Sequence, residues 1–140
     1  MTDLIKIGNC SGFYGDKLSA AKEMVEGGDL DVLTGDYLAE LTMTILFNQQ
    51  IQRGEDKGYV GTFLKQVKEI VHTCKNKNIK IVTNAGGLNP SSMANEIEKI
   101  LKEAELDLKV AYITGDNLMP KLEELKLSLI HISEPTRPLY

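Results

Sequence analysis

Short apolar runs alternate with longer stretches of helical periodicity along this chain. The apolar runs end in glycine or polar residues, which is typical of buried strands in a parallel sheet, and they occupy residues 4–7, 30–33, 79–83 and 108–113. Helical spacing predicts helices from Asp16 as N-cap to a stop at Gly27, and over residues 37–47, 60–75, 91–105 and, more weakly, 119–125. The predicted order is β-α-β-α-α-β-α-β-α.

This order predicts an α/β fold with a mostly parallel sheet and helices on both faces. An open, doubly wound sheet is favoured over part of a barrel, and four strands are few for either. We therefore expect an incomplete fragment of a larger domain. The polar stretch 49–59 contains two glycines. It predicts a mobile surface loop able to cover a site.

Composition and charge narrow the class of protein. A length of 140 residues is typical of one domain, and 42% hydrophobic with 26% charged residues excludes disordered, collagen-like and coiled-coil chains. The net charge of −4 and the lack of a basic patch argue against nucleic acid as a partner. No targeting segment or long apolar run points to a membrane, so we expect a cytoplasmic protein. Cys10 and Cys74 lack metal-ligand spacing, which fits a reducing compartment and gives no support for zinc.

The last residues of the chain have an unusual sequence. Residues 127–137 read LSLIHISEPTR. This run resembles a translated sequencing-library adapter, although an ordinary C-terminal strand and turn would also fit its propensities. We expect residues 1–126 to be the native part, with the remainder of the domain missing after residue 126, and residues 127–140 to be a non-native tail.

The candidate catalytic and ligand-binding residues lie in the loops that follow the predicted strands. Ligands of open α/β sheets bind there, at the carboxyl ends of the strands. Asp16 and Asp36 are the candidates for acid-base catalysis or for holding a divalent ion, although each alone also suits a helix cap. The candidate ligand-binding residues share these loops: Asn9, Cys10, Ser11, Gly12, Glu40, Asn84, Gly86, Gly87, Asn89 and Asp116. The expected partner is a small-molecule ligand. The metal and any cofactor stay open.

Several familiar motifs are not matched by these loops. The glycines of the first loop follow G-x-x-x-G-x-x-G rather than the dinucleotide pattern, no Walker sequence occurs, and Ser11 lies one place late for a nucleophile elbow. Cys10 could be a thiolate nucleophile, but a small packing residue is the favoured alternative. His72 fits a solvated or capping residue on its helix, and His131 lies in the unusual tail.

The same loops carry a resemblance to a known family. The blocks KIGNCSGFYGD at 6–16, LTGDYLAELTM at 33–43 and TNAGGLNP at 83–90 resemble the N-terminal domain of the acyclic terpene utilisation protein family. The resemblance covers roughly residues 5–125 and implies a fragment, because members are several times longer. It also implies a link to catabolism of acyclic terpenes such as citronellol and geraniol through acyl-CoA intermediates.

Two functions follow as hypotheses. The first is a catabolic protein that acts on a small organic acid or acyl-CoA thioester of terpene or related breakdown, with its site at the strand-end loops. The second is a non-catalytic interaction or scaffold subunit, in which glycines and carboxylates serve only turns and caps. Whether the chain is an enzyme, and whether it forms a homo-oligomer or joins a catabolic complex, stays open at this point.

Overall fold

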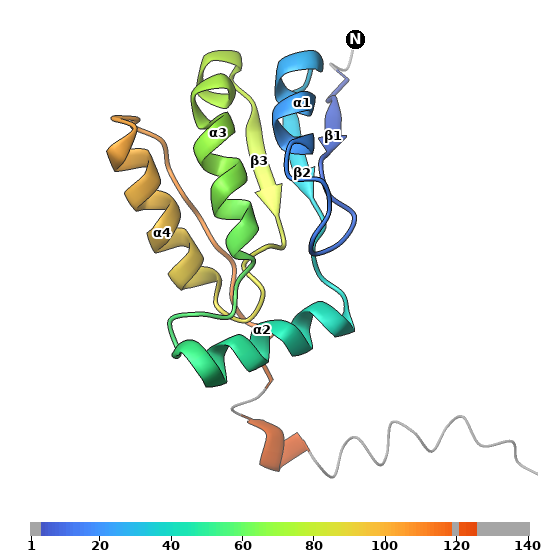
Figure 1. The fold of residues 1–140 in the computed structure, drawn as a ribbon, viewed down its shortest axis with the longest axis vertical. Helices are drawn as coiled ribbons and strands as arrows, with labels where there is room; N and C mark the ends of the chain where they lie inside the picture. Colours follow the sequence, from blue (N-terminus) through green and yellow to red (C-terminus); the bar gives the residue numbers. More distant parts are fainter. Residues whose placement is uncertain (1–3, 119–120, 126–140) are drawn as a thin grey trace, which may run out of the picture.

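A computed structural model describes residues 4–118 and 121–125 of the chain. Its strands β1 (Ile7–Asn9), β2 (Val32–Gly35) and β3 (Lys80–Thr83) form a parallel sheet in the order β1-β2-β3. The helices are α1 (Ala20–Gly27), α2 (Glu40–Arg53), α3 (Gly61–Lys77) and α4 (Pro90–Glu103), as Figure 1 shows. The predicted α/β class with a parallel sheet is confirmed.

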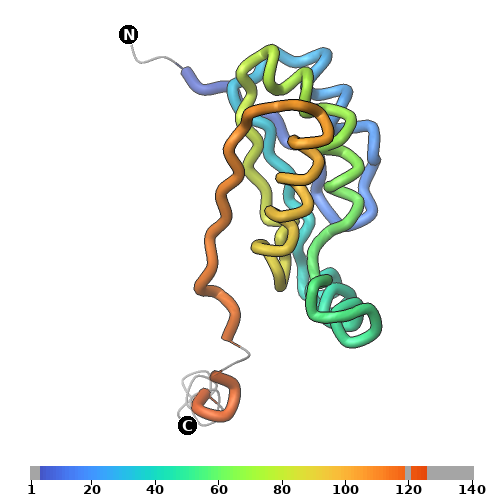
Figure 2. Tube along the Cα trace, turned by 90° about the vertical axis from the view of Figure 1, so that its left-hand side faces the viewer, coloured from blue at the N-terminus to red at the C-terminus, as the bar shows by residue number. Residues whose placement is uncertain are grey.

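The order of the strands decides where the helices lie. The chain advances from β1 to β2 to β3 without reversing, and right-handed crossovers then place the helices that pack on the sheet on one side. Figures 1 and 2 show α1, α3 and α4 as one layer on that side, while α2 lies across the carboxyl ends of the strands. The second helical layer of the sequence prediction does not lie within the described residues.

The two faces of the sheet differ in burial. Leu33 is fully buried against the helices, and Ile81 on the neighbouring strand packs against the same core. On the opposite face, Ile5, Ile7 and Val82 are 70%, 64% and 60% exposed. We call this second surface the bare face. Parallel sheets are usually covered on both faces, so an apolar bare face is unusual for the class.

Helix α3 lies at the centre of the core. It contributes Phe63 and Val67 to the cluster shared with α4, and Ile70 and Cys74 to the cluster shared with α1. Burying an aliphatic side chain of this size stabilises the fold by about 1.5–3 kcal/mol, so α3 contributes strongly to both clusters. Among the described residues, none of the helices has both the length and the apolar character that crossing a bilayer requires.

The predicted loop at 49–59 is wrong in its first half. Helix α2 continues to Arg53 and ends at Gly54, whose φ of 114° lies in the region that favours glycine. The polar run before it consists largely of glutamine, a good helix former, so its polarity marks a solvent-facing helix rather than a loop. The loop that follows is anchored, because Asn89 Nδ2 donates to the Glu55 carbonyl (2.8 Å) and Tyr59 is buried.

The predicted fourth strand at 108–113 is also wrong within the described residues. This segment is extended but joins no ladder, although Leu106, Leu108 and Val110 pack against the core at alternate positions. Its apolar alternation therefore reflects packing without sheet hydrogen bonds. The first strand begins at Ile7 rather than at residue 4. Residues 121–125 are helical, whereas 119–120 and the tail from 126, with His131, lie outside the described residues.

Candidate functional site

The loops after β1, β2 and β3 meet at the carboxyl end of the sheet, beside α2 (Figure 1). Hydrogen bonds join them directly. The Asp36 amide donates to the Ser11 carbonyl (3.0 Å), Asn84 Nδ2 donates to Asp36 Oδ1 (2.7 Å), and the Tyr37 amide donates to Asn84 Oδ1 (2.8 Å). We call residues 9–16, 36–40 and 84–89 the rim. The structure thus brings together three of the loops in which the sequence analysis placed the candidate site.

Asp36 lies directly after β2 and is exposed. One carboxylate oxygen is fixed by Asn84, and within the described residues the other accepts no hydrogen bond. The side chain does not cap α2, whose N-cap residue is Ala39 and has no side-chain cap bond. The capping alternative is therefore wrong for Asp36, and its free oxygen can meet a ligand.

Asp16 is held in a different way. Its Oδ2 accepts from the Gly12 amide (2.9 Å) and its Oδ1 accepts from the Lys17 amide (2.7 Å). These two amide donors, with Gly12 the stronger cause, hold the pKa of the Asp16 carboxyl below its usual range. Helix α1 begins at Ala20 with Ser19 as N-cap, so the predicted cap at Asp16 is wrong as well. Asp16 closes its own loop.

Cys10 and Ser11 are buried residues of the rim and do not reach its surface. Cys10 is 4% exposed, and burial is the main cause that raises the pKa of its thiol, so it stays protonated at neutral pH. The Ser11 hydroxyl donates to the Phe13 carbonyl (3.0 Å) and is equally buried. These contacts agree with the packing alternative for Cys10. Gly12 is exposed and offers its amide to Asp16.

The loop after β3 is tightly packed. Gly87 has a φ of 53°, and a Cβ there would lie 2.4 Å from Leu46 Cδ1 and 2.7 Å from the Gly58 carbonyl oxygen. A Cβ at Gly86 would lie 2.8 Å from Pro90 Cβ. Close approach of the chain therefore accounts for both glycines without a ligand. Asn89 caps α4, because its Oδ1 accepts from the Ser92 amide (3.1 Å).

The remaining candidates divide into rim and non-rim residues. Asn9 is exposed at the end of β1, where its Oδ1 accepts from Thr34 Oγ1 (3.3 Å), and Glu40 is exposed as the first residue of α2. Asp116 is exposed on the segment after residue 113. Within the described residues no hydrogen bond or ion pair joins Asp116 to the rim. Four candidates thus present side chains at the rim surface: Asn9, Asp36, Glu40 and Asn84.

The charge of the rim is one-sided. Its three loops carry Asp16, Asp36 and Glu40 and no lysine, arginine or histidine. The nearest lysine in sequence, Lys17, pairs with Glu23 at 2.7 Å. In the part of the chain that the structure describes, no group of three or more histidine, cysteine, aspartate or glutamate side chains is arranged to hold a metal ion.

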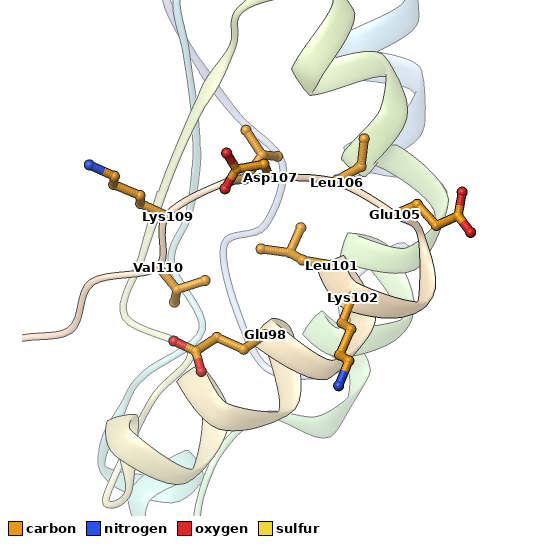
Figure 3. A pocket seen from close by; sticks show the side chains of 9 residues that line it. Glu98, Leu101, Lys102, Glu105, Leu106, Asp107, Lys109 and Val110 are labelled. Atoms are coloured by element: carbon orange, nitrogen blue, oxygen red, sulfur yellow. The ribbon is translucent and has the colours of Figure 1, made fainter.

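A groove of about 650 Å³ lies away from these loops, between the end of α4 and the segment that follows it (Figure 3). The sequence carries no signal for this groove, because its apolar and charged residues are ordinary for an amphipathic helix and its neighbour. No rim residue lines it. Its lining residues come from one stretch of chain: Glu98, Leu101, Lys102, Glu105, Leu106, Asp107, Leu108, Lys109 and Val110.

Comparison with known proteins bears on the identity of the chain. No curated protein and no solved structure matches it. The family model described as acyclic terpene utilisation family protein AtuA matches residues 5–137. This match confirms the resemblance seen in the three sequence blocks and covers most of the chain. The protein therefore belongs to the acyclic terpene utilisation family AtuA.

Proposed function

We propose that the rim binds a small organic acid or acyl-CoA thioester formed during terpene breakdown, and that Asp36 exchanges a proton with it. The observation that carries this proposal is that the two oxygens of the Asp36 carboxylate differ in their hydrogen bonding. Asp36 is exposed, and Asn84 fixes one of its oxygens at 2.7 Å, while the other accepts no hydrogen bond within the described residues. A general acid or base needs both features, a fixed orientation and a free oxygen.

The charge of the rim favours the acyl end of a thioester over the carboxylate of a free acid at these loops. Three carboxylates without a basic side chain in the same loops would repel an ionised acid. The carbonyl of a thioester is neutral and can accept hydrogen bonds from amide groups such as that of Asn9. The acyl end of a thioester is therefore the ligand that suits these loops better.

Asn84 has a positioning role in this proposal. Its Oδ1 accepts from the Tyr37 amide (2.8 Å) and its Nδ2 donates to Asp36 (2.7 Å), so both ends of the side-chain amide are committed. The backbone of the second loop thereby orients the carboxylate of that same loop. A ligand would meet Asp36 already held in place.

The test is the substitution Asp36→Asn in the source strain, with growth on an acyclic terpene as sole carbon source. We expect growth to stop while the purified variant keeps a melting temperature close to that of the unchanged protein, because the amide preserves shape but cannot exchange the proton. The matched control is Asp107→Asn, an exposed aspartate outside the rim, which should leave growth unchanged. Normal growth of the Asp36→Asn strain would contradict the proposal, and loss of folding would favour a structural role.

A second function, a non-catalytic interaction subunit, is favoured by the bare face. Ile5, Ile7 and Val82 give this surface an apolar character that water does not stabilise. The variant Val82→Thr keeps strand propensity but adds a polar group there. If it stops growth on the terpene while Asp36→Asn does not, the interaction subunit is the better account.

A further inference from the structure

A buried polar contact behind the rim involves a residue that sequence periodicity passes over. Gln66 of α3 is only 3% exposed and lies on the same helix face as Phe63 and Ile70. A glutamine at such a position needs partners for both ends of its side-chain amide. The structure supplies both, since its Oε1 accepts from the Tyr37 hydroxyl (2.6 Å) and its Nε2 donates to the Leu18 carbonyl (3.2 Å).

These two partners lie in or next to two different loops of the rim. Leu18 follows the first loop and leads into α1, whereas Tyr37 follows Asp36 directly. The Tyr37 hydroxyl also lies 4.0 Å from Cys10 Sγ at the start of the first loop. Gln66 therefore links the first two loops. It holds the end of the first loop through Leu18, and through Tyr37 it reaches the second loop and the start of the first.

The ring, the hydroxyl and the backbone amide of Tyr37 are each held by a neighbouring residue. Its ring packs edge-to-face on Phe63, with ring centroids 5.7 Å apart, and folds back over Gly35, where a Cβ would lie 2.6 Å from the ring. Burial is the main cause that raises the pKa of Tyr37, so its hydroxyl stays a donor to Gln66. Its amide meanwhile holds Asn84. One side chain and its backbone thus reach all three loops.

We propose that Gln66 and Tyr37 are positioning residues that hold the first two rim loops in register and so orient Asp36. Neither residue needs a bound ligand to do this. The inference rests on the proposed function only in treating the rim as the ligand site. Neither side chain is exposed enough to touch a ligand, since Tyr37 and Gln66 are both 3% exposed. Their effect on any ligand passes through Asp36 and Asn84.

Hydrogen exchange on the full 140-residue chain without ligand tests this inference. In Gln66→Leu we expect the amides of Cys10 and Asp36 to exchange about ten-fold faster, because local opening of both loops becomes easier. These amides donate to the Thr34 carbonyl (2.9 Å) and the Ser11 carbonyl (3.0 Å) in the intact rim. The matched control is Gln52→Leu, an exposed glutamine of α2, which should leave both rates unchanged.

A second variant covers the case in which Gln66→Leu fails to fold. The pair Tyr37→Phe with Gln66→Met removes the hydroxyl and its acceptor together, so no partner of that bond is left buried and unsatisfied. We expect this pair to fold and still to show about ten-fold faster exchange at Cys10 and Asp36. Unchanged rates, or an equal rise at these amides and at Leu88 of the third loop, would overturn the inference. Because no ligand is present, that result would leave the role of Asp36 itself to the growth test.

Discussion

The loop after β1 and the loop after β3 have similar residues but different surroundings. In the first loop, Gly12 has open space around it, with no atom nearer than 3.9 Å to the position of a Cβ. In the third loop, Gly87 is pressed against Leu46 and the Gly58 carbonyl, which a Cβ would approach to 2.4 and 2.7 Å. The first loop is closed by the side chain of its own Asp16. The third loop is closed by α2 and by the loop that follows α2.

This difference teaches that glycine and polar residues after a strand do not by themselves mark a ligand site. In both loops such residues hold the chain itself: Asp16 accepts hydrogen bonds from the amides of Gly12 and Lys17, and Asn89 caps α4. The second loop, between them in the sheet, holds Asp36 with an oxygen to spare. Three predictions test whether the two outer loops differ as described.

The largest effect is expected at Gly87. The variant Gly87→Ala should lower the free energy of unfolding by at least about 2 kcal/mol, because a positive φ and a clash with Leu46 add together. The matched control Gly12→Ala, in open space at a φ outside the left-handed region, should change it by less than about 1 kcal/mol. Urea unfolding of the two variants measures both values. Equal losses would erase the contrast between the loops.

A smaller effect is expected at Asn89. The variant Asn89→Ala removes the N-cap of α4 and should cost about 1–2 kcal/mol in urea unfolding. It should also speed proteolysis between residues 54 and 60, because Asn89 Nδ2 no longer holds the Glu55 carbonyl. Asn95→Ala, an exposed change in the same helix, serves as the control and should cost nothing. If both variants unfold at the same urea concentration, the cap does not anchor the third loop.

The smallest effect is expected at Asp16 and depends on pH. Its folded pKa lies below the usual value of 3.8, so its contribution to stability is present above that value and is lost as pH falls through the folded pKa. The melting temperature of the unchanged protein should therefore drop more steeply below about pH 4 than that of Asp16→Asn. Parallel curves for the two proteins would show that the amides of Gly12 and Lys17 do not stabilise the carboxylate.

Helices with strong periodicity were predictable from the sequence. The predicted ranges 60–75 and 91–105 correspond to α3 (Gly61–Lys77) and α4 (Pro90–Glu103), because apolar residues recur at helical spacing over about that length. The end of α2 was not predictable in this way, since glutamine in a solvent-facing helix looks like loop composition. The start of the first strand was also shifted, because Ile5 supplies apolar character on the bare face although the ladder begins only at Ile7.

The candidate site was predictable as a place but not as a set of roles. The topology rule alone locates the loops that carry Asn9, Asp36 and Asn84 at one end of the sheet. It cannot show which carboxylate keeps a free oxygen, because Asp16 and Asp36 each directly follow a glycine after a predicted strand. It also passes over Gln66, whose partners come from segments distant in sequence. Only three-dimensional contacts separate these cases.

The most direct test of the rim as ligand site is a nuclear magnetic resonance titration of the ¹⁵N-labelled chain with the CoA thioester of an acyclic terpenoid acid. The account predicts that amide shifts concentrate at Asn9, Asp36 and Asn84, and that the free acid produces smaller shifts at the same positions. Shifts confined to the groove at Leu101 and Val110, or no shift at the rim at all, would contradict it.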